Sequence, residues 1–225
     1  MNIIQRVLFE IFRAPLALFW YLRGWRLSID KLEDDKVILT GSPHTSNWDY
    51  MNFLLAAITL RRKIFVTIKS ELFFFPLGFI LKALGGIPID RHSSQNFVEQ
   101  LTDRLNEADR MVLLFTPDGT RSFRPYWKTG FYWVSKATGI PVTLAIPDYQ
   151  KKFVYMDYKF HPTGDIEEDF VKIREMQETY GYGLYPEKTN PVITRSAYEE
   201  QVMDAETDLS AIEKMDIAAN TELSA

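Results

Sequence analysis

A histidine and an aspartate five positions apart form the most chemically suggestive pair in this sequence. His44 and Asp49 bracket the segment His-Thr-Ser-Asn-Trp-Asp, which follows an apolar run and opens a helical pattern. A neutral imidazole can accept a proton, and a carboxylate on its other nitrogen selects the tautomer and stabilises the imidazolium that forms. By itself the pattern is explained more simply by a helix-capping aspartate beside an incidental surface histidine.

Helix geometry limits how these two side chains can meet. Five residues of a regular α-helix turn through about 500°, which leaves the two positions roughly 140° apart. His44 must therefore lie in the turn before the helix, with Asp49 in the first helical turn, where a carboxylate also suits the helix dipole. Pro43 and the capping residues at 45–47 predict a helix start at this point.

A second block, residues 115–122, has the sequence Phe-Thr-Pro-Asp-Gly-Thr-Arg-Ser. Its Pro-Asp-Gly core is first of all a turn, in which Gly119 supplies a backbone geometry that other residues resist. The turn does not explain Thr120, Arg121 and Ser122. Hydroxyls beside a guanidinium on a glycine turn suit phosphate, because guanidinium binds phosphate oxygens bidentately.

A third block, residues 86–91, ends in Asp90 and Arg91. The default interpretation pairs Arg91 with Asp90 or with a neighbouring helix. Beside Arg121, however, Arg91 would complete a cationic pocket for a phosphomonoester.

The apolar pattern predicts strands and helices that alternate and could position these blocks. Strands are expected at 36–40, 64–68, 85–91, 111–115, 142–146 and, as an antiparallel or edge strand, 153–160. Helices are expected at 47–60, 94–108, 129–138 and 167–180. This alternation predicts an α/β layered domain with a mixed central sheet flanked by helices.

Composition excludes several classes of protein. The 225 residues are 46% hydrophobic and 25% charged, with no cysteine and three histidines. A disordered or fibrous chain, a disulfide scaffold, a thiolate metal site and a cysteine nucleophile are thereby excluded, and a histidine-rich metal site is disfavoured. The net charge of −4 comes from residues 197–225, where eight acidic residues accompany one lysine, which leaves +3 on the rest. That small excess suits anionic lipids or phosphorylated ligands and does not predict nucleic-acid binding.

The N-terminal segment, residues 1–26, predicts a helix that lies on a membrane surface. Glu10 and Arg13 interrupt it, and the uncharged stretch 14–22 is shorter than the roughly 20 apolar residues of a spanning helix. The same charges argue against a secretory signal. Tryptophans and a tyrosine beside arginines near its end are typical of an interfacial helix.

A second apolar stretch, residues 72–81, contains Pro76 and Gly78 and is a poor regular helix or central strand. It is either a buried loop with a core helix turn or a bilayer-facing patch at the mouth of a lipid site. Together the two stretches predict peripheral or monotopic association with a membrane, at its cytoplasmic face.

The blocks, in order, resemble the glycerolipid acyltransferase family that includes the 1-acylglycerol-3-phosphate O-acyltransferases. The family's H-x-x-x-x-D matches 44–49, G-x-I/F-x-I/V-D-R matches 86–91, F-P-E-G-T-R-S matches 115–122, and an apolar proline-bearing strand matches 140–147. The similarity spans about residues 36–150. Asp118 stands where the family usually has Glu, and this shorter reach leaves the identity of the acyl acceptor open.

The resemblance implies transfer of a fatty acyl group from a thioester, on CoA or acyl carrier protein, to the free hydroxyl of a lysophospholipid, foremost 1-acylglycerol-3-phosphate, which gives phosphatidic acid. His44 would remove the hydroxyl proton and Asp49 would orient His44. Thiolate is a good leaving group, so no metal or other cofactor is expected. The backbone after His44 or around 140–141 would stabilise the oxyanion. The same resemblance assigns substrate binding to Arg91, Asp118, Gly119, Thr120 and Arg121.

The expected organisation is a membrane-interfacial helical segment (1–26), an acyltransferase domain (27–196) and an acidic, flexible tail (197–225). A serine hydrolase is disfavoured because no G-x-S-x-G occurs. A non-catalytic lipid-binding module would not need the His44 and Asp49 pair. The alternative that stays open is the same chemistry on another lysophospholipid, an amino-acid-derived lipid or a saccharide lipid. The expected partners are the lysolipid, the thioester carrier and a membrane surface, without nucleic acid.

Overall fold

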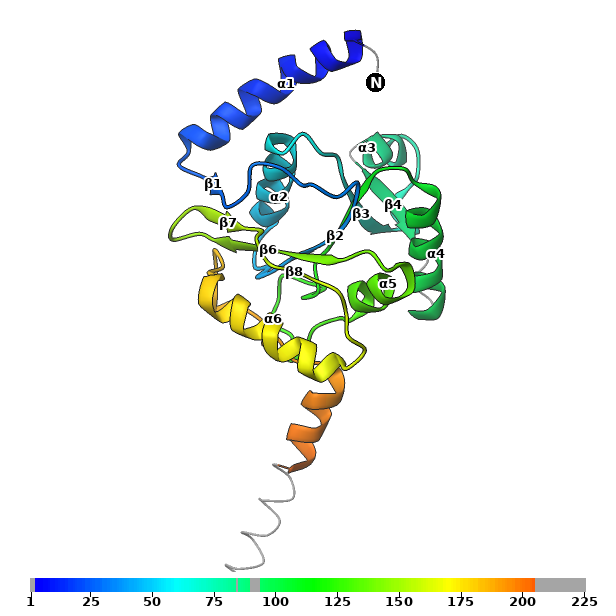
Figure 1. The fold of residues 1–225 in the computed structure, drawn as a ribbon, viewed down its shortest axis with the longest axis vertical. Coiled ribbons are helices and arrows are strands. Elements are labelled where there is room, and N and C mark those ends of the chain that lie inside the picture. Colours follow the sequence, from blue (N-terminus) through cyan, green and yellow to red (C-terminus); the bar gives the residue numbers. More distant parts are fainter. Residues whose placement is uncertain (1–2, 84, 90–93, 205–225) are drawn as a thin grey trace, which may run out of the picture.

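A mixed sheet with parallel central strands forms the middle of the structure, a computed structural model that describes residues 3–83, 85–89 and 94–204 (Figure 1). The strand order across the sheet is β1-β7-β6-β2-β5-β3-β4, and β8 also pairs with β6. Strand β2 is parallel to β5 and β6, whereas β7 and β8 run antiparallel to β6. The predicted mixed α/β fold is confirmed. The strands are β1 (Arg26–Leu27), β2 (Lys36–Gly41), β3 (Ile64–Lys69), β4 (Gly86–Ile89), β5 (Met111–Phe115), β6 (Val142–Asp148), β7 (Phe153–Tyr155) and β8 (Lys159–Phe160).

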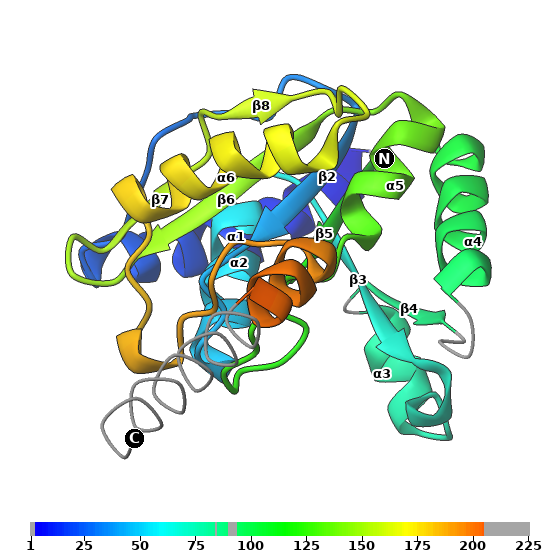
Figure 2. The ribbon, with the colours of Figure 1, turned by 90° about the horizontal axis from the view of Figure 1, so that it is seen from below.

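Helices cover both faces of this sheet. Figure 2 shows α4, α5 and α6 along one face, while α2 lies on the other. Residues 195–204 form a further helical stretch that projects from the body (Figure 1). The helices are α1 (Ile3–Leu22), α2 (Asn47–Thr59), α3 (Leu77–Ala83), α4 (Ser94–Glu107), α5 (Gly130–Thr138) and α6 (Ile166–Tyr180), with 3-10 turns η1 (Ser70–Leu72) and η2 (Pro186–Lys188).

The central strands are apolar on both faces because each face is covered by helices. In β2, Val37 and Leu39 pack with α2, whereas Ile38 between them joins the cluster under α4, α5 and α6. In β5, Val112 and Leu114 likewise pack with α2. This burial on both sides explains why the sequence shows continuous apolar runs at these strands.

The expected strand at 153–160 is divided into β7 and β8. Tyr155 of β7 is opposite Ile146, whereas Phe160 of β8 is opposite Val142. The two pairings differ in register by one residue, so the segment between them carries one extra residue, as in a β-bulge. An alternating pattern of side chains does not reveal such an insertion, and the prediction of one continuous strand was wrong for that reason.

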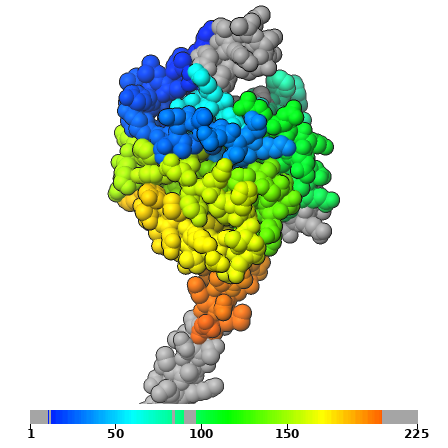
Figure 3. Space-filling model, viewed as in Figure 1, coloured from blue at the N-terminus to red at the C-terminus, as the bar shows by residue number. Residues whose placement is uncertain are grey.

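The two apolar stretches form helices with exposed faces at the same end of the molecule. The described part of α1 and the α3 region lie at this end in the space-filling view (Figure 3). The 72–81 stretch contains the end of η1 and most of α3, and Phe75 and Phe79 are 92% and 78% exposed. No helix within the described residues combines the length and hydropathy needed to cross a bilayer. Of the expected tail, residues 197–204 are helical and 205–225 lie outside the described residues.

Candidate active site

The chemically suggestive blocks follow two neighbouring parallel strands. Thr40 near the end of β2 is opposite Phe115 at the end of β5, so the segments after both strands leave the sheet at one edge. The connection from β2 enters α2 on one face, and the connection from β5 leads to α5 on the other. Divergent connections open a crevice outside the carboxyl ends of such strands, which is where α/β sheets bind ligands.

His44 and Asp49 meet as helix geometry requires. Helix α2 begins at Asn47, with Ser46 as N-cap, so His44 lies in the preceding turn and Asp49 is the third helical residue. His44 Nδ1 lies 3.1 Å from Asp49 Oδ2, and this same oxygen accepts the Ser46 amide at 2.7 Å. The Asp49 side chain is fully buried, whereas the His44 side chain is 16% exposed. The carboxylate is thus held by backbone, and the imidazole faces the crevice.

Asp118 lies behind the turn that carries His44 instead of at the rim of the crevice. Its carboxylate accepts the His44 amide at 3.2 Å, and the residue is 1% exposed. Burial raises the pKa of the Asp118 carboxyl above its ordinary value, although a hydrogen bond from Ser42 and the nearby His44 oppose the shift. The expected substrate contact of Asp118 stays a prediction, and its observed contacts support the backbone that carries His44.

The glycine turn places a guanidinium beside the start of α2. Gly119 has a φ of +68°, and its amide donates to the Thr116 carbonyl at 2.9 Å. Arg121 is exposed and donates through Nη1 to Asn47 Oδ1. Thr120 lies half-buried between them. The turn after β5 and the first residue of α2 therefore meet at the rim of the crevice.

Arg91 and Asp90 lie outside the described residues, so the predicted second arginine stays a prediction. A lysine that the sequence analysis did not assign to the site lies near Gly119 instead. A Cβ built on Gly119 would come within 2.8 Å of Lys128 Cε, which shows how closely the Lys128 side chain passes the turn. Only the fold brings the Lys128 side chain to the rim.

Tyr149 is the second residue that sequence reasoning missed. Its hydroxyl donates to Asp49 Oδ1 at 2.5 Å from a position 100 residues further along the chain. Strand β6, which Tyr149 follows, is parallel to β2 and ends at the same edge of the sheet. Knowledge of the strand order would have located Tyr149, but the sequence alone does not contain that order.

A cavity of about 1560 Å³ opens beside His44. Its polar part contains Asn47, Arg121 and Lys128. Apolar side chains from several strands and helices line much of the remainder: Phe53, Val66, Ile68, Leu72, Leu81 and Phe97. The arrangement combines a proton-accepting pair, cations at a rim and an apolar wall, which together suit a ligand with a charged head and a long apolar chain.

The topology places the two expected sources of oxyanion stabilisation at opposite edges of the sheet. Residues 140–141 precede β6, and Val142 of β6 is opposite Ile38 in the parallel strand β2. They therefore lie toward the edge of the sheet opposite to the end of β2, from which His44 departs. The alternative at 140–141 was wrong, and the backbone after His44 is the one that lies at the crevice.

Comparisons with known proteins identify similar chains. The family model described as Acyltransferase matches residues 28–145. Among solved structures, the 1-acyl-sn-glycerophosphate (LPA) acyltransferase PlsC from Thermotoga maritima is similar, with 14% sequence identity, a TM-score of 0.48 and coverage of 78% of each chain. A comparison with curated proteins gives no match.

Proposed function

The chain belongs to the Acyltransferase family, and on that premise we propose that it transfers a fatty acyl group from a thioester to the free hydroxyl of a lysophospholipid. The observation that carries the proposal is the 3.1 Å contact between the buried Asp49 and His44, which lines a cavity together with Arg121 and Lys128. CoA or acyl carrier protein would carry the acyl group. The acceptor that we place first is 1-acylglycerol-3-phosphate, which would give phosphatidic acid.

His44 is the general base of this scheme. Because Nδ1 faces Asp49, the Nδ1–H tautomer leaves the lone pair of Nε2 to accept the proton of the acceptor hydroxyl. An alcohol is a weak nucleophile at neutral pH, and a positioned base accelerates such an attack by about 10²–10⁴-fold. As the thioester carbonyl is attacked, the C–S bond breaks and the thiolate leaves. This step requires no covalent enzyme intermediate, metal or further cofactor.

The acceptor phosphate is assigned to the rim of the crevice. Arg121 and Lys128 supply positive charge there, and the Gly119 turn with Thr120 supplies short polar groups close to it. The sequence block 86–91 assigns Arg91 to the same phosphate-binding site. A bound phosphate would hold the acceptor so that its free hydroxyl stays near His44 Nε2, which converts an encounter in solution into an oriented one.

Asp118 is assigned a supporting role. A carboxylate that is 1% exposed and accepts the His44 amide cannot reach a ligand at the rim without losing that bond. The alternative acceptors, another lysophospholipid, an amino-acid-derived lipid or a saccharide lipid, belong to the same scheme and differ in the group that meets Arg121.

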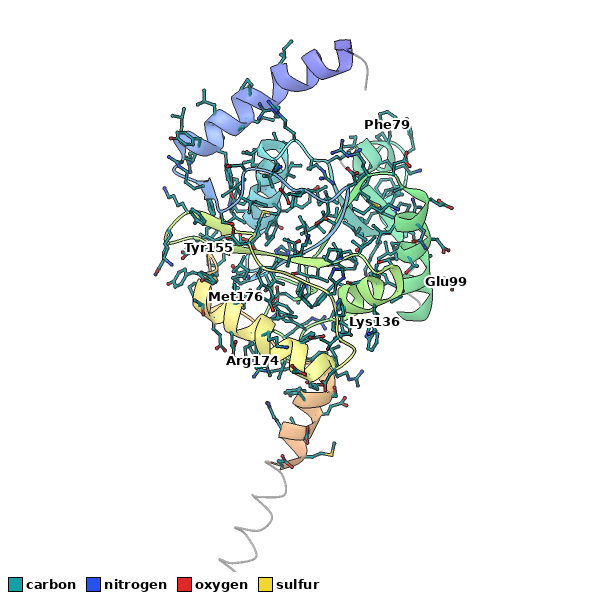
Figure 4. All side chains as sticks on the ribbon, in the orientation of Figure 1. Phe79, Glu99, Lys136, Tyr155, Arg174 and Met176 are labelled. Atoms are coloured by element: carbon teal, nitrogen blue, oxygen red, sulfur yellow. The ribbon has the colours of Figure 1, made fainter. Side chains whose placement is uncertain are left out.

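The acyl chains would enter from a membrane surface. Large apolar side chains of α1 and of the α3 region are exposed at one end of the molecule, and Figure 4 shows Phe79 projecting from α3 at that end. Leu72 and Leu81, from the same region as Phe79, also line the cavity. A lipid could therefore pass from a bilayer to the cavity along one continuous apolar region. We propose peripheral or monotopic association with the cytoplasmic face of a membrane on this basis.

Thiol release from palmitoyl-CoA in detergent micelles, with and without lysophosphatidic acid, tests the proposal. Wild type is expected to release thiol only with acceptor, and His44→Ala should lower the rate by about 10²–10⁴-fold. His161→Ala, which changes an exposed histidine after β8, is the matched control. Full turnover by His44→Ala would remove His44 from the mechanism. Thiol release without acceptor would indicate a thioesterase. If turnover occurs only with another lysolipid or with an acyl carrier protein donor, that compound replaces lysophosphatidic acid or palmitoyl-CoA as the proposed substrate.

A further inference from the structure

The carboxylate of Asp49 is satisfied by three donors from different parts of the chain. Oδ2 receives the Ser46 amide and faces His44 Nδ1, while Oδ1 accepts the Tyr149 hydroxyl. The Asp49 side chain has no exposure to solvent. A buried carboxylate that loses a donor keeps the full cost of its desolvation, so each donor helps to determine its orientation.

Two further side chains determine the direction of the Tyr149 hydrogen bond. The Trp20 indole, which can only donate, gives its proton to Asn52 Oδ1 at 3.2 Å. Asn52 Oδ1 is thereby identified, so Asn52 Nδ2 is the group that donates to the Tyr149 oxygen at 2.9 Å. The Tyr149 proton is then directed to Asp49, which can only accept when it is ionised. These hydrogen bonds therefore all point in one direction, from the Trp20 indole, which can only donate, to the ionised Asp49 carboxylate, which can only accept.

Packing holds the members of this series in place. The Tyr149 ring meets Trp25 edge to face with centroids 5.1 Å apart, and Trp25 stacks on Trp20 at 5.9 Å. The Tyr149 amide donates to the Tyr182 carbonyl at 2.9 Å. Asn52 lies three positions after Asp49 on α2, which places both on one helix face. The hydroxyl of Tyr149 therefore has little freedom to leave Asp49.

We propose that Tyr149 is a positioning residue that holds the Asp49 carboxylate in the orientation that selects the Nδ1–H tautomer of His44, with Asn52 and Trp20 directing its proton. The proposal rests on the proposed function for its catalytic meaning. Its structural content, the tautomer of His44, can be measured without any substrate.

The titratable groups around the pair agree with this role. Burial, with the hydrogen bond to Asp49, raises the pKa of the Tyr149 hydroxyl, so it remains a donor over the ordinary range of pH. On the side of the turn after β5, Asp118 faces His44 through its backbone amide, and Arg121 lies at the rim against Asn47. Neither group contacts Asp49 Oδ1 among the described residues, so Tyr149 is the contact to vary.

Tyr149→Phe removes the hydroxyl and keeps the ring on Trp25. With ¹⁵N-labelled histidine, the three histidines of the chain give few ring signals, and His44→Ala identifies those of His44. Wild type is expected to show the Nδ1–H tautomer of His44, and Tyr149→Phe a mixture with the Nε2–H tautomer. In the thiol-release assay kcat should fall about tenfold, as expected for a lost hydrogen bond to a charged group, with KM for both substrates little changed.

Tyr158→Phe is the matched control. Tyr158 is half-buried in the hydrophobic cluster under α4, α5 and α6, where it packs on Phe160. This substitution should leave both the tautomer and kcat unchanged. Should Tyr149→Phe not fold, Asn52→Ala gives the decisive result, since it removes the donor to the Tyr149 oxygen and should shift the tautomer in the same direction. An unchanged tautomer in the folded variant would overturn the proposal. A shifted tautomer in a protein without transferase activity would support the positioning role and reject the proposed function.

Discussion

The two buried aspartates of the site differ in their hydrogen-bond donors. Asp49 is fully buried and is satisfied by donors on both oxygens, so its charge is compensated. Asp118 is also buried, but burial outweighs its hydrogen bonds from Ser42 and His44 and raises its pKa. At the residue scale, Asp49 is therefore suited to stabilise an imidazolium. Asp118 holds the His44 backbone amide, and its raised pKa makes its contribution to folding stability depend on pH.

Asp118→Asn should change how stability depends on pH. A carboxyl with a raised pKa binds its proton more tightly in the folded state, so the stability that it contributes is complete below its ordinary value of 3.8 and is lost as pH rises through the folded value. The free energy of unfolding of wild type minus that of the variant should therefore decrease as the pH rises from 4 to 7. Urea unfolding at a series of pH values measures this difference. Asp157→Asn, at an exposed position, should show no such trend; equal trends would contradict the assignment.

Arg121→Ala should weaken acceptor binding far more than donor binding. The guanidinium lies at the rim beside Asn47, where the phosphate of a lysophospholipid is proposed to bind. Loss of a charged hydrogen-bond donor should raise KM for lysophosphatidic acid about tenfold or more, with KM for palmitoyl-CoA within about twofold. Arg124→Ala, three positions away and exposed, is the control. Equal increases in both KM values would exclude the phosphate grip.

At the scale of elements, the start of α2 sets the geometry of the His44–Asp49 pair. The Ser46 hydroxyl accepts the Trp48 amide at 3.1 Å, and the Asp49 carboxylate returns to the Ser46 amide, which forms a capping box. Asp49, which faces His44 Nδ1, is therefore also a capping residue of α2. One local motif thus serves both helix stability and the site.

Ser46→Ala should lower the free energy of unfolding by about 1 kcal/mol, because the hydroxyl that caps α2 is lost. Urea unfolding followed by circular dichroism measures the change. Met51→Ala changes an exposed residue of the same helix and should stay close to wild type. If the two variants were equally stable, the cap would contribute nothing measurable to this helix.

At the scale of the whole molecule, exposed apolar side chains gather on α1 and α3. Helices α1 and α3 lie at one end of the molecule in Figure 1, whereas α6 lies on the opposite side of the sheet. Leu22 of α1 is 73% exposed, and Phe75, between η1 and α3, is 92% exposed. Exposed apolar side chains gathered in this way are typical of a surface that meets a partner or a membrane. This end is therefore the surface that the proposed membrane association would use.

Phe75→Ser combined with Phe79→Ser should reduce binding to vesicles of phosphatidylglycerol and phosphatidylcholine. Each ring removed from the interface forfeits a large apolar contact, so we expect the binding constant to fall about tenfold or more. Cosedimentation measures the bound fraction. Val171→Ser, at an exposed position of α6, is the control. Binding that is equally strong in the double variant and the control would show that the α3 region does not contact the bilayer.

The elements of this protein were largely predictable because their signals are local. The apolar runs predicted the cores of β2, β5 and β6, and the candidate caps at 45–47 predicted the start of α2, since burial on both faces and capping depend on nearby residues. The spacing of His44 and Asp49 also predicted that they could meet at a helix start. The bulge between β7 and β8 was not predictable, because register is set by a partner strand.

The sequence by itself therefore determined the helix start, the candidate pair on it and the resemblance to an acyltransferase family. Only the tertiary structure decided which distant groups complete the site. Tyr149 meets Asp49 because β6 is parallel to β2 and ends at the same edge, and Asp118 supports His44 because β5 is the other neighbour of β2. Strand order is a property of long-range packing, in which residues about 100 positions apart become neighbours, and no local pattern encodes it.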